Sequence, residues 1–432
     1  MSYTFKMFLH LDLDCFFVSA HRTIDSSLED IPVAVGGRSN LNIFSSKKEV
    51  RKISSNSGAF VSTILTNEGQ KSFKDYFVDE NGRIRGIITT ASYEARAYGV
   101  KTAMSVNEAL KLCPHLKMLP PNYPLYHELS QKLKELLIKE IPLVEQFSID
   151  EFFGDVTGYI GEDEIVEFAY NLKKKIYQEL KLPISIGVAN TKFLSKLITE
   201  YAKPDGVKYV GANYIANFTR NIPIEEFPGI GKGFQKRLKG YGIKTLGDIR
   251  KKRELFYSWK KPGIDLYNRV CGIRDTKLTL EREKKSIGIG RSFDPIFERD
   301  ELKRRVMILS RYLCFLVKKA NVNPLTYAIK IKYEYKIKSK NYINVNRIFN
   351  ETDFKEAMIH LFEQNDIHPK HGVVQLNITV SNFAKVNEYT YNLFEYEEDL
   401  KKRELTNQMQ KLRVKFGVDI IKSASEIKDD KL

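Results

Sequence analysis

This sequence predicts an α+β fold in which helices cover one face of an antiparallel sheet, and three observations support that prediction. Apolar residues alternate along residues 7–14, which predicts a strand whose second face ends in the carboxylates of Asp12 and Asp14. Residues 147–155 predict two apolar strands joined by a tight turn that carries Asp150 and Glu151. Up to residue 188 the order is strand, irregular segment, helix, hairpin, helix and strand, which is typical of the split-βαβ arrangement.

The acidic residues of these two stretches predict a metal site. If the strands are neighbours in one sheet, Asp12, Asp150 and Glu151 converge at its end, and they repel one another unless protons or cations neutralise them. Ligands that offer only oxygen suit Mg²⁺ or Mn²⁺ better than zinc. Each stretch alone also fits solvated acids on a strand edge or in a turn, whereas the two together favour the metal site.

Composition narrows the class of protein. The 432 residues are enough for two to four domains, and a hydrophobic content of 42% supports real cores. The net charge of +16, from 70 Lys+Arg against 54 Asp+Glu, favours a polyanionic partner, although a lysine-rich proteome gives the same balance.

Cysteine spacing and hydropathy exclude other classes. The four cysteines lie far apart without CxxC spacing, which predicts a reducing compartment and no zinc site. The N-terminal stretch already carries Asp12 and Asp14, so we expect no signal peptide. No apolar run approaches the roughly 20 residues that a bilayer span needs, so we expect no membrane partner.

Residues 16–119 contain the next elements in order. We expect a short helix at 18–28, a strand at 31–35, an irregular segment with one helix at 39–86, a strand at 87–90 and a helix at 106–112. Tyr93 and Arg96 would share a helical face, where a hydroxyl and a planar guanidinium suit phosphate oxygens. The alternative is a surface arginine beside a half-buried tyrosine.

The segment after residue 120 completes the first domain and opens a second. Helices are expected at 125–141, 164–180 and 192–201, and Lys203 follows the last of them in a place to reach inward. Gly229 and Gly231 flank Ile230 just before a basic helix that begins at Lys232. Backbone N–H groups at such a turn bind a phosphate, and the spacing fits a helix-hairpin-helix motif better than a plain helix–helix turn.

The C-terminal third predicts a tether, an α/β domain and a tail. Residues 274–286 are mostly charged, a helix is expected at 301–319, and strands are expected at 325–337 and 374–380. Lys330 and Lys332 would lie on a basic-to-polar face that suits a nucleic-acid backbone or is merely solvated. In the polar tail, Leu393 and Phe394 form an apolar island that suits a partner's groove, followed by a helix to Phe416.

Five motifs together resemble the Y-family (translesion) DNA polymerases, nearer the bacterial UmuC and polymerase IV branches than the eukaryotic ones. They occur in the family's order at residues 12–17, 91–96, 147–151, 202–204 and 228–231. The resemblance covers residues 7 to about 385, and the tail is similar to clamp-binding tails of bacterial members, with Thr390 where the family usually has Gln.

The resemblance implies a right-hand polymerase with a ferredoxin-like palm, small fingers, a helical helix-hairpin-helix thumb and an α/β little finger. The implied ranges are 1–15 and 120–209 for the palm, 16–119 for the fingers with a long insertion at 39–86, 210–275 for the thumb, 276–286 for a linker, 287–385 for the little finger and 386–432 for the tail.

The same resemblance implies roles for single residues. Asp12, Asp150 and Glu151 would be the catalytic acids that hold two Mg²⁺ ions, with the Leu13 carbonyl as a further ligand and Mn²⁺ as a substitute, whereas Asp14 would not bind metal directly. The remaining implied contacts are Phe16 and Phe17 at the nucleotide, with Phe17 as the steric gate, Tyr93, Arg96 and Lys203 at the triphosphate, Gly229, Gly231, Lys232, Lys330 and Lys332 at the DNA, and Leu393 and Phe394 at the clamp.

The implied activity is template-directed DNA synthesis of low fidelity from dNTPs, in DNA damage tolerance. Its partners would be primer-template DNA, dNTP and a sliding clamp, and we expect a monomer in a bacterial cytoplasm, associated with the nucleoid. The alternatives are a nucleotidyl cyclase with a similar palm, an inactive relative that acts as a scaffold, and a DNA-binding protein without activity. The basic faces argue against the first, and the intact acids argue against the other two.

Overall fold

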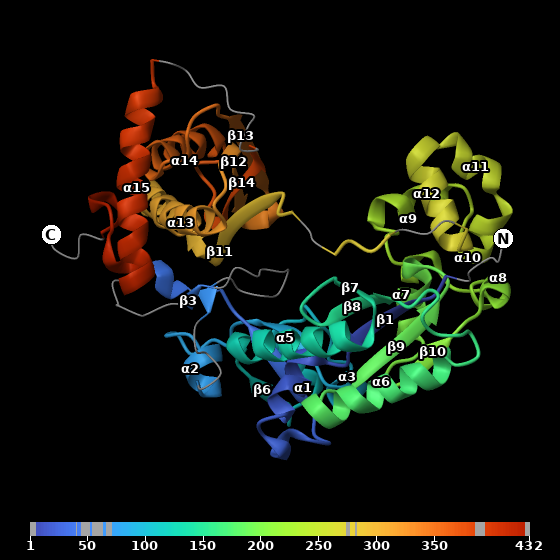
Figure 1. Ribbon diagram of the computed structural model, residues 1–432. Helices are drawn as coiled ribbons and strands as arrows, with labels where there is room; N and C mark the ends of the chain where they lie inside the picture. Colours follow the sequence, from blue (N-terminus) through green and yellow to red (C-terminus); the bar gives the residue numbers. More distant parts are fainter. Residues whose placement is uncertain are drawn as a thin grey trace. The chain divides into compact units, whose positions relative to one another are not determined.

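The computed structural model describes residues 6–39, 41–44, 52–53, 64–65, 71–273, 277–280, 283–384 and 394–427. The chain forms two compact units, one of residues 1–37 and 67–282, the other of residues 38–66 and 283–432. Figure 1 shows the elements of each unit. In the described part of the chain, no helix is both long and apolar enough for a membrane span.

The first unit is built on a five-stranded sheet in the order β10-β9-β1-β8-β7. The strands are β1 (Phe8–Leu13), β7 (Leu143–Gln146), β8 (Glu151–Asp155), β9 (Ile184–Ala189) and β10 (Val207–Tyr209). β1 is antiparallel to both β8 and β9, which confirms that the two acidic stretches are neighbours. One detail of the prediction was wrong: Glu151 does not lie in the turn but begins β8, where it pairs with Asp12.

Helices lie on both faces of this sheet. α5 (Tyr123–Glu140) and α6 (Ile165–Leu180) run across one face (Figure 1). A Cβ on Gly154, the partner of Leu9, would lie 2.9 Å from Ile141 at the end of α5. α7 (Lys192–Glu200) packs on the other face, where a Cβ on Gly187, the partner of His10, would lie 2.4 Å from the Ser195 carbonyl oxygen. Adjacent strand residues point to opposite faces, so Leu9 and His10 separate the two helix layers.

A smaller sheet in the order β5-β2-β6 forms another part of this unit. Its elements are α1 (Phe16–Arg22), η1 (Ser26–Leu28), β2 (Val33–Gly37), α2 (Phe73–Phe77), β5 (Ile87–Ala91), α3 (Tyr93–Ala97), α4 (Val106–Leu112) and β6 (Lys117–Leu119). Serine side chains cap α3 and α4, because Ser92 and Ser105 each accept from the N–H three residues on. The predicted helix at 18–28 is in fact α1 and the separate turn η1.

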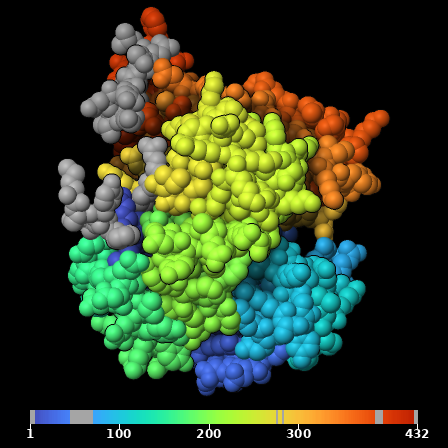
Figure 2. Space-filling model, turned by 90° about the vertical axis from the view of Figure 1, so that its right-hand side faces the viewer, coloured from blue at the N-terminus to red at the C-terminus, as the bar shows by residue number. Residues whose placement is uncertain are grey.

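Short helices complete the first unit. They are η4 (Ala212–Tyr214), α8 (Ile215–Phe218), η5 (Ile224–Glu226), α9 (Lys232–Gly240), α10 (Leu246–Lys251), α11 (Arg253–Ser258) and α12 (Lys260–Cys271). Their apolar side chains share one core with Leu194, Leu197 and Ile198 of α7. Figure 2 shows the yellow and yellow-green atoms of this part of the chain next to the green ones. These helices therefore pack against α7, the helix on the face of the sheet that carries Asp12 and Glu151.

The second unit is a four-stranded sheet in the order β11-β14-β12-β13, covered on one face by two helices. Its elements are β11 (Ser286–Ile296), α13 (Arg299–Ala320), β12 (Pro324–Tyr333), η6 (Glu334–Lys336), β13 (Lys338–Asn344), α14 (Glu351–Asn365) and β14 (Val373–Phe383). The prediction of one strand at 325–337 was wrong, because the chain turns after Tyr333. Tyr335 has a φ of 56° and is exposed, so it does not continue the buried face.

The segment 38–66 belongs to the second unit and not to the unit that contains the β5-β2-β6 sheet. Its described elements are η2 (Leu41–Phe44), β3 (Lys52–Ile53) and β4 (Ile64–Leu65). Ile43 and Phe44 are buried in the second unit's core, and Arg304 donates to the Phe44 carbonyl oxygen. The irregular stretch therefore contributes an apolar anchor that its mixed composition did not reveal.

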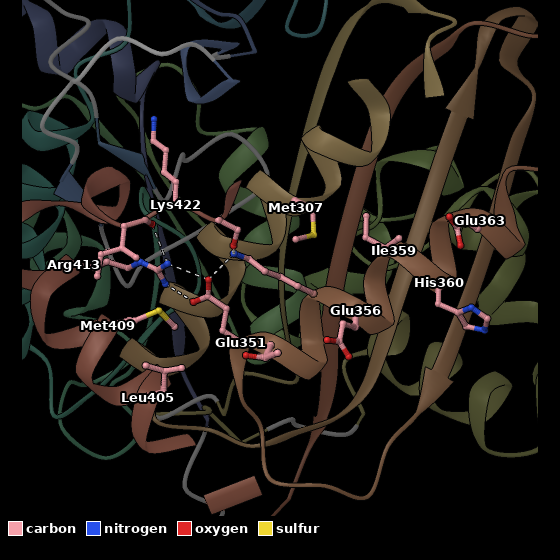
Figure 3. Close-up of a pocket in the computed structure, with 14 residues that line it drawn as sticks. Met307, Glu351, Glu356, Ile359, His360, Glu363, Leu405, Met409, Arg413 and Lys422 are labelled. Carbon is pink, nitrogen blue, oxygen red and sulfur yellow. Dashed lines mark hydrogen bonds and ion pairs between the residues drawn. The ribbon is translucent and has the colours of Figure 1, made fainter. Parts of the chain in front are cut away.

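The C-terminal region is folded against α13 and α14. It contains α15 (Tyr396–Phe416), as the expected helix to Phe416 predicted, and the turns η7 (Val418–Ile420) and η8 (Ala424–Glu426). Glu351 is buried and paired with Arg413 (Figure 3) and with Lys355. Lys355 also bonds Glu426. A cavity of about 540 Å³ lies beside these ion pairs, and none of the residues predicted for catalysis lines it.

Candidate active site

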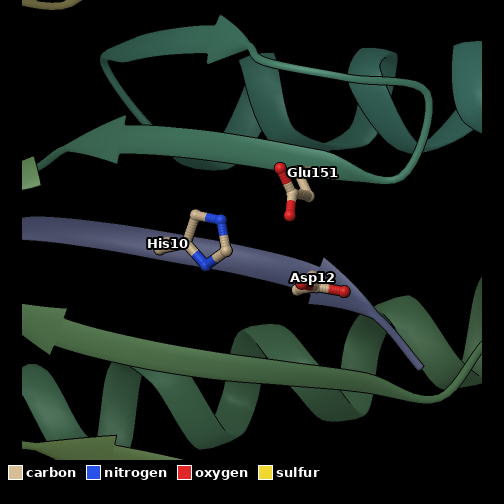
Figure 4. A group of neighbouring side chains, drawn as sticks. All are labelled: His10, Asp12 and Glu151. Carbon is tan, nitrogen blue, oxygen red and sulfur yellow. The ribbon is translucent and has the colours of Figure 1, made fainter. Parts of the chain in front are cut away.

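The strand register places two of the predicted acids side by side. Asp12 on β1 and Glu151 on β8 are directly paired, so their side chains leave the same face of the sheet. His10 shares that face, and one ligand atom from each of the three side chains lies within 4.8 Å of the others (Figure 4). The pairing explains why residues 139 apart in sequence form one site.

Asp150 lies in the turn just before Glu151. The Leu13 N–H, at the end of β1, donates to the Asp150 carbonyl oxygen at 3.1 Å, which ties the turn to the strand that carries Asp12. Ser148 donates its hydroxyl to the Asp150 carboxylate. Burial raises the pKa of Asp150, and the nearby Glu151 raises it further. The predicted acids therefore occupy one partly buried end of the sheet.

Two lysines neutralise these carboxylates in the protein itself. Lys203 Nζ donates to Asp12 Oδ2 at 2.9 Å and to Glu200 at 2.9 Å, and Lys196 of α7 is paired with Glu151. Burial raises the pKa of Asp12 to about 7, against the opposing effect of Lys203. Burial alone would lower the pKa of Lys203, but Asp12 and Glu200 raise it above its usual value. Burial therefore disfavours the ionised form of Asp12 and Asp150, and the nearby lysines favour it.

Asp14 has a different environment from Asp12. Its carboxylate accepts from the Tyr93 hydroxyl, the Ser185 hydroxyl and the Asp205 N–H, each at 2.8 Å. It is buried, and these donors satisfy both oxygens. Asp14 therefore acts as a structural link between β1, α3 and the loop that follows α7.

Asp14 joins Tyr93 to the loop that contains Lys203, and Arg96 lies beside Tyr93. Asp14 bonds both Tyr93 and the N–H of Asp205, two residues beyond Lys203. The exposed Arg96 guanidinium lies 4.8 Å from the centroid of the Tyr93 ring, and its Nε donates to the Ala91 carbonyl oxygen. Burial and Asp14 raise the pKa of Tyr93, so its phenol is a donor at neutral pH.

Phe16 and Phe17 begin α1 shortly after Asp12 and Asp14. Both are buried, and the Phe17 ring is stacked on Tyr126 of α5 with centroids 4.3 Å apart and an interplanar angle of 11°. The Tyr126 hydroxyl bonds His21 Nε2 at 2.9 Å, which fixes the ring below Phe17. Phe17 is therefore held in one orientation against α5.

The residues predicted to contact DNA lie on surfaces of the two units. Gly229, Gly231 and Lys232 are exposed at the start of α9, and Gly229 has a φ of 96° that favours glycine. In the second unit, Lys330 is paired with Lys340 and Lys332 with Lys338, and all four side chains are exposed on the face away from the helices. Leu393 lies outside the described residues, and Phe394 is 98% exposed just before α15.

The sequence reasoning missed His10, Lys192 and Lys196. His10 had a signal, because it lies two residues before Asp12 and so shares its face in a strand. Lys192 and Lys196 are one helical turn apart, but only the fold brings them to Glu145 and Glu151. Buried carboxylates and an imidazole nitrogen without a partner among the described residues are a donor set that fits a divalent cation.

Comparison with known proteins identifies the class. The model of the impB/mucB/samB family matches residues 11–200, and that family's C-terminal domain matches residues 284–393. A solved structure, "Y-family DNA polymerase chimera Dbh-Dpo4(243-245)-Dbh", is similar with a TM-score of 0.69 and 21% identity, over 87% of this chain and 99% of that one. The chain therefore belongs to the Y-family of DNA polymerases, and it is a DNA-directed DNA polymerase of translesion synthesis.

Its curated relatives within the family are DNA polymerase IV proteins. The one from Lactococcus lactis subsp. cremoris (strain MG1363) is 31% identical over 310 residues, which cover 69% of this chain and 84% of the relative. The one from Clostridioides difficile (strain 630) is 28% identical over 405 residues, which cover 92% of this chain and 99% of the relative. This membership removes the cyclase and the non-enzymatic DNA-binding protein as alternatives.

Proposed function

We propose that Asp12, Asp150 and Glu151 hold the divalent cations of nucleotidyl transfer, with Mg²⁺ as the usual ion, Mn²⁺ as a substitute and the Leu13 carbonyl as a further ligand. The observation that carries this proposal is the direct cross-strand pairing of Asp12 with Glu151, next to Asp150. Divalent cations bound there would neutralise the triphosphate and make the primer 3′-oxygen a better nucleophile.

The chain's own side chains would hold the nucleotide. Arg96 offers an exposed guanidinium with its Nε fixed on the backbone, so its other nitrogens are available for phosphate oxygens. Lys203 is partly buried and already oriented toward Asp12, and Tyr93 holds α3 against Asp14. We infer that Tyr93 contributes by positioning as well as by its hydroxyl. Phe16 and Phe17 would line the nucleotide, with Phe17 excluding a 2′-hydroxyl.

Primer-template DNA would bind to both units through its phosphates. A Cβ on Gly231 would meet no atom within 4 Å, so packing within the chain does not require glycine there, whereas close approach of a phosphate to the backbone would. The facing lysine pairs Lys330–Lys340 and Lys332–Lys338 repel each other without a polyanion to neutralise them. We assign the palm, thumb, linker and little finger to the ranges given above, and the fingers to 16–119 without the segment 38–66, which folds with the second unit.

The tail and the location of the protein complete the proposal. Phe394, together with Leu393, would enter an apolar groove of a sliding clamp, and the 98% exposure of Phe394 supports this role. The enzyme would act as a monomer in the cytoplasm, with the nucleoid as its site of work.

The test is primer extension by Asp12→Asn and Glu151→Gln in Mg²⁺. We expect each variant to lose at least about 1000-fold in rate, equal to about 4 kcal/mol. Affinity for primer-template DNA, measured by fluorescence anisotropy, should stay within a few fold. Asp155→Asn is the matched control, because Asp155 lies on the same strand at its far end, paired with Phe8, and should retain activity. Full activity of either acid variant would refute the proposed site.

A further inference from the structure

His10 is a buried side chain of the active site to which the proposed mechanism gives no role. It is 0% exposed and lies on β1 two residues before Asp12, on the face that carries Asp12 and Glu151. Figure 4 shows its ring on β1, the strand of Asp12, with Glu151 on the neighbouring strand. Its Nε2 atom is buried and has no hydrogen-bond partner among the described residues. A buried polar atom without a partner costs free energy unless something else occupies that position.

The fold holds the His10 ring in one orientation. Its cross-strand neighbours are Phe153 on β8, whose ring centroid lies 4.6 Å away, and Gly187 on β9. Because Gly187 has no side chain, α7 approaches the strand closely there, and Thr199 Oγ1 reaches His10 Nδ1 at 2.9 Å. A larger residue at position 187 would collide with α7, so the glycine, the helix and the imidazole form one arrangement.

The hydrogen bonds of Thr199 determine which ring nitrogen carries the proton. The Thr199 hydroxyl lies 2.9 Å from the Ser195 carbonyl oxygen, a helical i−4 acceptor to which its single proton is donated. Thr199 Oγ1 then accepts from His10, so Nδ1 carries the proton and Nε2 keeps its lone pair. A lone pair therefore faces the two carboxylates.

We propose that His10 Nε2 is a ligand of the divalent cation that binds between Asp12 and Glu151, and that it shifts the preference of this site from Mg²⁺ toward Mn²⁺. The inference rests on the proposed function of the acids. Three negative or lone-pair groups within 4.8 Å of one another form a donor set for a cation, besides the two lysines that already pair with the acids. Ligands of one ion with bonds of about 2.1 Å lie at most about 4.2 Å apart, so two donors at the 4.8 Å limit would approach each other by about 0.6 Å on binding.

The chemistry of nitrogen ligands gives the preference. Mg²⁺ selects oxygen and binds imidazole weakly, whereas transition metals accept carboxylate and imidazole together. The hydrogen bond from Nδ1 to Thr199 is the kind of contact that orients a metal-bound histidine and increases its basicity. Lys196 and Lys203 each occupy one oxygen of the acids, so the ion would share or displace these ammonium groups.

The test is pulsed electron paramagnetic resonance on Mn²⁺ in the complex of the full chain with a dideoxy-terminated primer-template and the next dNTP. Protein labelled with ¹⁵N-histidine is compared with unlabelled protein, so a nitrogen coupling that changes with the label comes from histidine. We expect such a coupling in the unaltered chain. Its absence while Mn²⁺ is bound would overturn the proposal, and this result does not depend on how any variant folds.

Variants assign the coupling to one residue. His10→Phe keeps an aromatic ring against Phe153 and should remove the coupling, raise the Mn²⁺ dissociation constant at least about tenfold and lower the Mn²⁺/Mg²⁺ preference in extension. His127→Phe is the matched control, because His127 Nε2 on α5 is also buried without a partner among the described residues, and the coupling should persist. Unchanged coupling and affinity in His10→Phe would overturn the inference.

Asp12→Asn separates this inference from the proposed function. We expect it to lose Mn²⁺ binding altogether. If Mn²⁺ binds normally to Asp12→Asn, the acids are not the metal site and the proposed function fails. If Asp12→Asn abolishes binding while the unaltered chain shows no histidine coupling, the acids hold the metal and only the role of His10 fails.

Discussion

At the scale of single residues, two aspartates of one motif differ because of their neighbours. Asp14 is surrounded by three donors and behaves as a structural anion. Asp12 lies against Glu151 in a buried position, and only cations offset its unfavourable charge. The same side-chain type is therefore stabilising at one position and costly at the other, and the costly one is the proposed catalytic residue.

This contrast predicts opposite stability changes for the two aspartates. Asp14→Ala leaves one buried and two partly buried donors unpaired and should lower the free energy of unfolding by about 3 kcal/mol. Asp12→Asn should raise it by about 1 kcal/mol at pH 8, because the raised pKa of Asp12 means that folding disfavours its anion there. Urea unfolding without divalent cations measures both. A loss of stability in Asp12→Asn would show that its charge is structural.

A second prediction at this scale concerns sugar selection. Phe17 is held flat against Tyr126, so Phe17→Ala removes a fixed ring and should raise the ratio of rNTP to dNTP incorporation by at least about tenfold. Single-nucleotide insertion with each substrate gives the ratio. Leu129→Ala controls for lost packing, since Leu129 is a buried residue of α5 but lies outside the motif that contains Phe17. An unchanged ratio in Phe17→Ala would place the gate elsewhere.

At the scale of elements, local signals predicted local structure well. The helix expected at 106–112 is α4, since Ser105 caps its start and Pro114 follows its end. The strand with Asp12 and the hairpin next to Asp150 are also present in the structure, because alternating residues and a short connection determine them. The roles of the individual site residues were implied by resemblance, and they remain predictions until the variants are measured.

What the sequence could not predict depends on distant partners. The turn at Tyr335 interrupts an alternation that has no Gly or Pro to mark it. Ile43 and Phe44 become core residues of the second unit only because α13 lies there to receive them. Lys196 reaches Glu151 only through the packing of α7, which no local pattern encodes. His10 differs, because its place two residues before Asp12 in a strand was a local signal.

The packing of α15 yields a prediction on pH. Burial would raise the pKa of Glu351, but Arg413 and Lys355 hold it below its usual value. A carboxyl with a lowered pKa in the folded state stabilises at pH values above its unfolded pKa of about 4.5, and this contribution is lost as pH falls through the lower folded pKa. We therefore expect α15 amides to lose protection below about pH 4.5 and to keep it at pH 7.

Hydrogen exchange, corrected for the intrinsic rate at each pH, measures this protection. Glu351→Gln should show weakened protection of α15 already at pH 7, because Arg413 and Lys355 then lack their buried anion. Glu356→Gln is the control, since Glu356 is exposed on the same helix. Equal protection of α15 in all three proteins across this pH range would mean that apolar contacts alone hold the helix.

At the scale of the whole molecule, charge and connectivity act together. The chain carries a net charge of +16, yet its proposed catalytic centre is a cluster of acids. The backbone passes between the two units three times, after residues 37, 66 and 282, so the second unit is joined to the first by more than the expected linker. Exposed lysines occur in both units, at Lys232 in the first and at Lys330 and Lys332 in the second. We expect the positive net charge to attract DNA at long range before the acids are reached.

The final prediction follows from the lysine pairs of the second unit. Each phosphate contact lowers the slope of log affinity against log salt by about 0.9, so replacing both Lys330 and Lys332 with Gln should make the slope shallower by about 1.8. Anisotropy titrations from about 50 to 200 mM salt on two unrelated primer-template sequences measure it, and both sequences should change equally because phosphates carry no base information. Lys411→Gln on α15 removes an exposed charge away from the sheet face and should leave the slope unchanged. A slope equal to that of the unaltered chain in the double variant would mean that this face carries charge without binding DNA.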